Sequence, residues 1–295
     1  MQAARRLRDL LEPVTGQVYF APECHAAYQA LGFGPSPTQL SGVAMPDRPA
    51  YFTSRGSVMG QVTGDVVAAA FAVFNPDAVV PSVAFGWTKT DAPTICRART
   101  DGATAQLVRV LGEVPDGLDE VTTILKKMCE VLRPEGRALY SGVRSQGAPG
   151  TPLGDMWWYG DQLREYRGDS HTIAWVSAGF DAVEIGLLTE LMWGMPLRSY
   201  IRSRAWSSDQ IDAAVDRLRS RGLVDGDAMS DAGREAREAV EAATDAQMSN
   251  AIDSLGDDTD TLFARLEPWG RAIVDAQGYL RGASDMADAL ADRSR

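Results

Sequence analysis

Residues 205–222 read AWSSDQIDAAVDRLRSRG and decide the fold. Ser207 and Gln210 have the spacing of a capping box, in which each side chain satisfies a free backbone N–H at the start of a helix. Gly222 stands where the end of a helix needs a left-handed residue. Three apolar residues recur on one helical face and must pack inward: Ile211, Val215 and Leu218. The stretch therefore predicts a well-specified helix between Ser207 and Gly222.

The surrounding residues 181–245 predict a winged helix-turn-helix. Two helical stretches lead into the capped helix, and the chain after it runs through a short hairpin at about 223–230. A long helix then begins near Asp231. This order of elements is typical of winged helix-turn-helix proteins, whose second helix lies in the major groove of DNA. The architecture indicates a regulator.

The exposed face of the predicted recognition helix has the wrong charge for DNA. Its N-terminal half, which reads the bases, carries Asp209, Asp212 and Asp216, and the wing Asp225-Gly226-Asp227 is also acidic. The arginines lie at the other end, where they complement the helix dipole: Arg217, Arg219 and Arg221. Residues 181–245 contain 13 acidic and 8 basic side chains. We therefore expect weak DNA binding or none.

Two resemblances follow from these residues. Residues 213–224 and 230–234 resemble the recognition helix, wing and following helix of MarR-type regulators, which implies a homodimer and a small apolar ligand, often phenolic. The whole chain also resembles a family of actinobacterial helix-turn-helix-containing proteins. The stretches that carry this second resemblance are Pro22 to Leu31 with His25, Phe74-Asn75-Pro76, Leu163-Arg164-Glu165, Arg167-Gly168-Asp169, His171 and the tail of the winged helix.

The rest of the chain is dominated by helical periodicity. We expect helices at about 2–13, 22–31, 63–73, 76–85, 91–112, 118–132, 152–167, 170–179 and 261–277, and a long helix from about 231 through 250. The Gly/Pro-rich segment 145–152 is the clearest linker. The predicted fold is all-α, a multi-helix protein with a small β-hairpin wing. We expect an N-terminal helical domain at 1–144 and a helical and winged-helix domain at 152–295.

Composition restricts the partners and the compartment. The formal net charge of −11 disfavours nonspecific attraction to nucleic acid or to anionic membranes. The apolar run at 66–74 is too short to span a bilayer, and the first residues place charges where a signal peptide has its apolar core. Three cysteines without C-x-x-C spacing disfavour a disulfide framework and a zinc ribbon. We expect a cytoplasmic protein with no membrane partner.

An aromatic block at 156–159, together with Trp175 and the nearby Arg164 and Arg167, can line an apolar pocket with a cationic rim. Such a pocket suits a planar, phenolic or partly anionic ligand. The alternative is that these aromatic residues only fill the core. The stretch 51–55 also resembles 200–204, and each precedes an Ala/Val-rich helix. The candidate ligand-binding residues are His25, Tyr51, Arg55, Trp158, Arg164, Arg167, Asp169, His171 and Trp175.

The two histidines have separate interpretations. Gly168 and Asp169 predict a helix end followed by a new cap, which places His171 in a first turn where the helix dipole favours neutral imidazole. The alternative is that His171 only fills space at that junction. His25 adjoins Cys24, and adjacent helical residues point about 100° apart, so they do not easily share a metal. Should His25 and His171 meet with Asp169 or Glu184, an acid/base or metal site becomes possible.

No dinucleotide fingerprint, phosphate loop, H-E-x-x-H motif or nucleophile elbow occurs. We therefore expect no cofactor and no metal, and we assign no catalytic residue. The sequence favours a small-molecule-binding protein on a MarR-like winged-helix scaffold, with an apolar or aromatic ligand and weak or no DNA binding. The alternatives are a ligand-responsive transcriptional regulator and a metabolic enzyme that uses His25 or His171.

Overall fold

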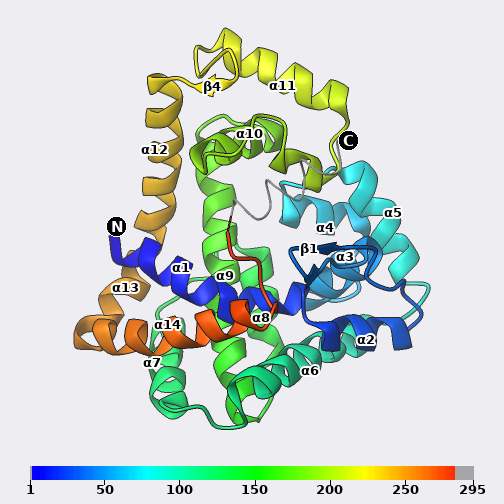
Figure 1. The fold of residues 1–295 in the computed structure, drawn as a ribbon, viewed down its shortest axis with the longest axis vertical. Helices are drawn as coiled ribbons and strands as arrows, with labels where there is room; N and C mark the ends of the chain where they lie inside the picture. Colours follow the sequence, from blue (N-terminus) through cyan, green and yellow to red (C-terminus); the bar gives the residue numbers. More distant parts are fainter. Residues whose placement is uncertain (1, 283–295) are drawn as a thin grey trace.

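The computed structural model describes residues 2–282, whose regular secondary structure is helical apart from two short hairpins (Figure 1). The predicted all-α fold is confirmed at this level. The α-helices are α1 Gln2–Gly16, α2 Pro22–Ala30, α3 Arg48–Gly56, α4 Gly64–Phe71, α5 Pro76–Gly86, α6 Ala92–Leu111, α7 Leu118–Glu130, α8 Ala138–Gln146, α9 Pro152–Ser177, α10 Ala182–Met192, α11 Ser208–Ser220, α12 Asp231–Gln247, α13 Ser249–Leu255 and α14 Thr259–Asp275. The short 3-10 helices are η1 Gln17–Tyr19, η2 Ser57–Met59, η3 Tyr200–Arg204 and η4 Gly256–Asp258.

The two hairpins are antiparallel pairs of two-residue strands. The first joins β1 (Gln39–Leu40) to β2 (Val43–Ala44), and the second joins β3 (Val224–Asp225) to β4 (Ala228–Met229). The second lies where the wing was predicted. The first was not predicted, and its buried Leu40 and Val43 pack against Leu280. Leu280 lies 237 residues beyond Val43 in the sequence, so short-range sequence patterns could not reveal this contact.

The central helix α9 runs through the molecule and packs against α1, α6, α7, α8 and α12 (Figure 1). The predicted break at Gly168-Asp169 is wrong, because α9 continues for 26 residues. A glycine inside a helix costs about 1 kcal/mol, and the buried neighbours Tyr166 and Trp175 offset that cost. Asp169 caps no helix of its own. Its Oδ2 instead accepts a hydrogen bond from the backbone N–H of Tyr140 in α8, at 3.0 Å.

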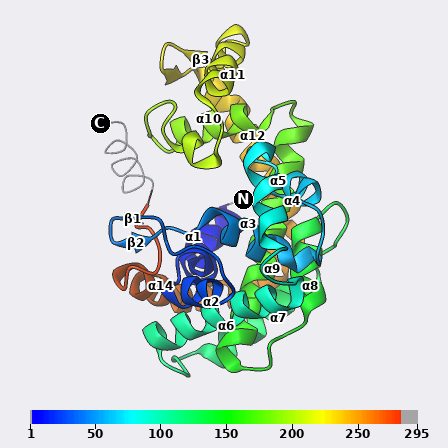
Figure 2. The ribbon, with the colours of Figure 1, turned by 90° about the vertical axis from the view of Figure 1, so that its right-hand side faces the viewer.

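The largest buried cluster takes residues from α1, α2, α6, α7, the first half of α9, α13 and α14. We call this part the body. It combines residues from both sides of the predicted linker at 145–152, and the division into domains 1–144 and 152–295 stays a prediction. A second cluster joins the end of α9 to α10, η3, α11, β3, β4 and α12. We call residues 182–229 the upper unit, which lies at one end of the molecule and is joined to the body by α9 and α12 (Figure 2).

The upper unit forms as its local sequence predicts. Ser207 and Gln210 make the reciprocal hydrogen bonds of a capping box at the start of α11, and Gly222 adopts a positive φ of 69° at its end. Asp181 and Glu184 make a second capping box at the start of α10. These signals are short-range, which is why the sequence alone locates them.

Helix α3 was not predicted, although its start carries a readable signal. Asp47 caps it by accepting a hydrogen bond from the backbone of Ala50 at 3.1 Å, and Pro49 lies in the first turn, where its missing N–H costs nothing. The predicted helix through 250 ends at Gln247, and a separate short helix follows. The other helix ends agree with the sequence to within a few residues.

Within residues 2–282, no single helix has the length and apolar character needed to cross a membrane. Helices α9 and α10 pass the test of length and composition only as a pair, bent by 110°.

Candidate functional site

A cleft of about 1780 Å³ lies between the upper unit and the body. It is larger than the pockets of roughly 300–1,000 Å³ that hold most small ligands. Helices α1, α3, α4, α9, α10, α12 and the segment η3 line it, together with residues 279–282. Ten arginines and seven carboxylates lie on its walls, in contrast to the acidic excess of the whole chain. The walls of the cleft therefore carry more basic than acidic side chains.

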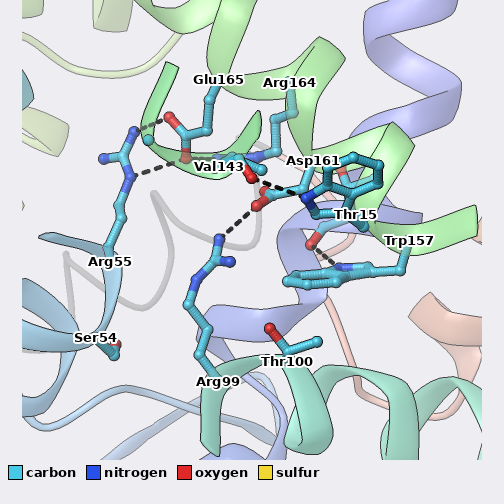
Figure 3. Close-up of polar contacts among 12 residues, drawn as sticks. Thr15, Ser54, Arg55, Arg99, Thr100, Val143, Trp157, Asp161, Arg164 and Glu165 are labelled. Atoms are coloured by element: carbon cyan, nitrogen blue, oxygen red, sulfur yellow. Dashed lines mark hydrogen bonds and ion pairs between the residues drawn. The ribbon is translucent and has the colours of Figure 1, made fainter. Parts of the chain in front are cut away.

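Glu165 of α9 is the centre of a buried polar group on one wall (Figure 3). Arg55 donates to both of its oxygens, at 3.0 and 2.7 Å. Arg164 and the hydroxyl of Tyr19 donate to Oε1, at 2.9 and 3.0 Å. Burial alone would raise the pKa of Glu165, but Arg55 and Arg164 lower it to about 2. This Glu165 cluster (Tyr19, Arg55, Arg164 and Glu165) therefore holds a carboxylate that stays ionised.

Arg164 is also bound to α1. Its Nη2 lies 3.0 Å from Oε1 of Glu12, and Tyr279 donates to the same oxygen at 2.9 Å. Arg55 and Arg164 were predicted to meet a ligand, but both are already paired with protein carboxylates. Their first role is to tie α3 and α1 to α9.

A second arginine–carboxylate pair lies deeper, beneath the cleft. Arg99 of α6 donates to Oδ2 of Asp161 at 2.8 Å, and the two side chains are 2% and 0% exposed. Burial lowers the pKa of Arg99, but the charge of Asp161 more than compensates and raises it above its ordinary value. The guanidinium also lies 4.9 Å from the ring centre of Trp157. This pair was not predicted, although Arg99 stands on the buried stripe of α6 with Ile95 and Ala103.

An ionic network holds α12 against α1 and α9. Glu241 of α12 pairs with Arg167, with Arg8 at 2.9 Å and with Arg237 at 3.0 Å. Burial would raise the pKa of Glu241, but Arg167 and Arg237 lower it to about 2. Asp245 adds contacts to Arg5 at 2.6 Å and to Arg167. Arg167 is therefore also neutralised by the protein.

His171 lines the cleft from the middle of α9, not from a first helical turn. Its Nδ1 lies 3.1 Å from Oγ1 of Thr244. Burial, followed by the charge of Arg237, lowers the pKa of His171 to about 4. Neutral imidazole is therefore favoured, but the cause is burial and neighbouring arginines instead of the helix dipole.

Asp169 is a buried acid on the same wall. Burial raises its pKa to about 7, although the hydrogen bond from the backbone of Tyr140 acts in the opposite direction.

Six of the nine candidate residues line the cleft: Tyr51, Arg55, Arg164, Arg167, Asp169 and His171.

The other three candidates do not line the cleft, since His25 and Trp175 are buried in the core and Trp158 is partly buried at its edge. His25 is buried on α2, its Nε2 lies 3.0 Å from the backbone oxygen of Tyr19, and burial lowers its pKa. Trp158 donates to the backbone oxygen of Val143 at 2.8 Å, and Trp175 belongs to the cluster of the upper unit. His171 lines the cleft and His25 does not. In the part of the chain that is described, no three His, Cys, Asp or Glu side chains are grouped to hold a metal ion.

Residues of η3 and α10 were missed as site residues. Arg204 and Tyr200 line the cleft, and the Arg204 guanidinium lies 4.6 Å from the ring centres of both Tyr200 and Phe74. The loop after α4 positions it, because Asn75 donates a backbone hydrogen bond to the carbonyl of Arg204 at 3.0 Å. Trp206 donates to the backbone oxygen of Val73 at 3.0 Å. The signal was present in the sequence, as the similarity of 200–204 to 51–55.

The outer face of α11 combines exposed acids with arginines that are already paired. Asp209, Asp212 and Asp216 are exposed. Three nearby arginines contact protein carboxylates. These contacts are Arg217 with Asp181 and Glu184, Arg219 with Asp216 and Asp227, and Arg221 with Glu184. Asp212 is paired as well, with Arg198 at 2.6 Å. Of these three acids and three arginines, Asp209 alone has no partner of opposite charge among the described residues, so this face presents an unpaired negative charge.

Residues 4–280 match a family described as a helix-turn-helix family. No curated protein and no solved structure matches the chain. The match extends over nearly the whole chain, so it includes the body as well as the upper unit. The chain therefore belongs to this helix-turn-helix family, and its fold is of the DNA-binding type.

Proposed function

We propose that this protein binds a small molecule on a MarR-like winged-helix scaffold and has weak DNA binding or none. The observation that carries the proposal is the cleft between the upper unit and the body. Its walls combine aromatic rings with arginines, and a concave site of that composition is suited to small organic ligands. Two apolar side chains remain exposed there, Trp193 at 48% and Met192 at 38%.

The scaffold part of the proposal rests on the order of elements. Helix α10, the short η3, helix α11, the β3–β4 hairpin and helix α12 follow one another as in a winged helix-turn-helix. In this interpretation α11 is the recognition helix and the hairpin is the wing.

The expectation of weak DNA binding rests on the charges of α11. A protein gains most of its affinity for duplex DNA from Lys and Arg that contact phosphates. The arginines of α11 already contact carboxylates of the upper unit, and Asp209 adds a negative charge that no described side chain neutralises. Binding to DNA would therefore first have to break internal ion pairs.

Ligand binding is expected to raise the thermal stability of the protein. A compound at 100 times its Kd adds about 2.7 kcal/mol to the free energy of unfolding. The measurement is the melting temperature across a panel of aromatic metabolites. Ala70→Trp, which places a large ring on the cleft wall, should remove most of the shift. Ala69→Trp, at an exposed neighbouring position that does not line the cleft, should keep it. No shift with any compound at millimolar concentration would contradict the proposal.

Duplex DNA should give no retarded band at protein concentrations on the order of 10 µM, even at low salt, where phosphate contacts are strongest. The duplexes are a random sequence and the region upstream of the protein's own gene. Replacing Asp209, Asp212 and Asp216 by Lys together should create measurable binding. The same change of charge at the exposed Asp101, Glu113 and Glu130 should create less.

The alternative function is a ligand-responsive transcriptional regulator, which membership of a helix-turn-helix family favours. A specific band with the upstream region that survives moderate ionic strength would establish that alternative and refute weak binding.

A further inference from the structure

Two Tyr–Arg pairs of the same spacing line the cleft. Tyr51 and Arg55 lie on α3, whereas Tyr200 and Arg204 lie on η3 of the upper unit. In each pair the arginine donates a hydrogen bond to the hydroxyl of the tyrosine four residues earlier, and Arg55 does so at 3.3 Å. The similarity of 51–55 and 200–204 in sequence is therefore also a similarity of local contacts.

The two arginines differ in their charge partners. Arg55 makes two hydrogen bonds to Glu165. Arg204 contacts no carboxylate among residues 2–282, and the hydroxyl of Tyr200 is the one acceptor that its side chain has there. A guanidinium has five N–H donors, so most of those of Arg204 are unused.

Arg204 is also partly removed from water. Burial lowers its pKa, and the positive charges of Arg55 and Arg164 act in the same direction. Every other lining arginine without a carboxylate partner in the described chain, Arg48 and Arg202, is exposed to solvent. A half-buried guanidinium without a counter-charge is costly, and an anionic ligand group removes that cost.

Apolar rings surround this unpaired charge. The guanidinium of Arg204 contacts the faces of Phe74 and Tyr200. The exposed ring of Trp193 continues this surface, with its centre 5.3 Å from that of Tyr200. Phe74 is already buried, whereas the ring of Tyr200 is half-buried and that of Trp193 is exposed. A small inorganic anion would leave the rings of Tyr200 and Trp193 facing water, whereas an apolar body attached to the anionic group would cover them.

From this arrangement we infer that the cleft binds an amphipathic carboxylate, with the carboxylate on Arg204 and the apolar body on Tyr200 and Trp193. An arginine binds a carboxylate through two parallel N–H···O bonds, and the unused donors of Arg204 provide them. This inference rests on the proposed function, because it names the ligand class of the same cleft.

The test compares three probes of similar shape by isothermal titration calorimetry. They are a naphthoate, the neutral naphthamide and a naphthyl phosphate. The wild-type protein should bind the naphthoate at least about tenfold more tightly than the naphthamide, since hydrogen bonds to a charged group are stronger than those to a neutral one. Arg204→Met keeps an unbranched apolar side chain and should reduce this ratio to about one. Arg97→Met removes an exposed arginine on α6, outside the cleft, and should leave the ratio unchanged.

Each other result has a definite meaning. Equal affinity for naphthoate and naphthamide would show that the cleft does not select a carboxylate, and it leaves the proposed function intact. A preference for naphthoate that survives Arg204→Met overturns the role of Arg204. Binding of the naphthyl phosphate alone overturns the choice of carboxylate over phosphate. If no probe binds but other panel compounds raise the melting temperature, the ligand class is wrong and the function stands. If nothing binds at all, both fail. Should Arg204→Met not fold, the wild-type ratio and Arg204→Lys decide the question.

Discussion

Asp161→Asn is expected to lower the free energy of unfolding by about 3–5 kcal/mol, the usual cost of leaving one partner of a buried ion pair without its counter-charge. Asp161 and Arg99 are 0% and 2% exposed, and Asn has nearly the same volume as Asp. The loss is therefore electrostatic and does not include a cavity. The loss should lie near the lower end of this range, because the native pair is itself incompletely satisfied. Oδ1 of Asp161 and Nε of Arg99 have no hydrogen-bond partner among residues 2–282.

Denaturant unfolding followed by tryptophan fluorescence measures this loss. The matched control is Asp258→Asn, which breaks an exposed pair with Lys127 at 2.9 Å. Exposed pairs contribute about 0–1 kcal/mol, so the control should be almost neutral. The double variant Arg99→Met with Asp161→Asn should recover part of the loss, because it removes both charges. A single-variant loss below that of the control would show that the buried pair does not stabilise the fold.

Asp169→Asn is expected to make stability less dependent on pH. Burial raises the pKa of Asp169 in the folded protein to about 7, whereas the unfolded chain has the ordinary value near 4. Between about pH 4 and pH 7 the folded protein keeps a proton that the unfolded chain loses. Stability therefore falls as the pH rises through this window, by up to about 4 kcal/mol for a difference of about three pKa units.

The asparagine variant has no carboxyl group to ionise and can still accept the hydrogen bond from Tyr140. It should match the wild type near pH 4 and exceed it at pH 8. Glu190, whose pKa burial also raises to about 7, and His171 are present in both proteins, so their effects cancel in the difference. Thermal unfolding at several pH values measures that difference. For the exposed Asp101→Asn, the difference in stability from the wild type should not vary with pH. If the difference for Asp169→Asn were equally independent of pH, the raised pKa of the buried Asp169 would be refuted.

The parts of this fold that the sequence predicts are those with short-range signals. The capping box at Ser207 and the left-handed Gly222 each act within one helical turn, and both are present where predicted. Gly168-Asp169 has the local pattern of a helix end, yet the packing of α9 on five other helices keeps it helical. At this position the tertiary contacts determine the conformation, against the local signal for a helix end.

The cleft was predictable only in part for the same reason. Six candidate residues line it, but their partners come from distant parts of the chain, such as Glu165 for Arg55. Sequence alone therefore could not tell a paired arginine from an unpaired one. Arg204 stands out only once the carboxylate partners and the exposure of the other arginines of the cleft are known.

The continuity of α9 has a consequence for how this protein can be divided. Leu153, Trp157 and Tyr166 of this helix fill the core of the body, while Ala174 and Trp175 fill that of the upper unit. This one continuous helix therefore contributes to both cores, and its 26 residues span about 39 Å. The upper unit is therefore not an interchangeable module. A gene fragment that ends near 150 lacks α9 and leaves the core of the body without its central helix, and one that begins near 150 carries Leu153 and Trp157 without the helices that bury them.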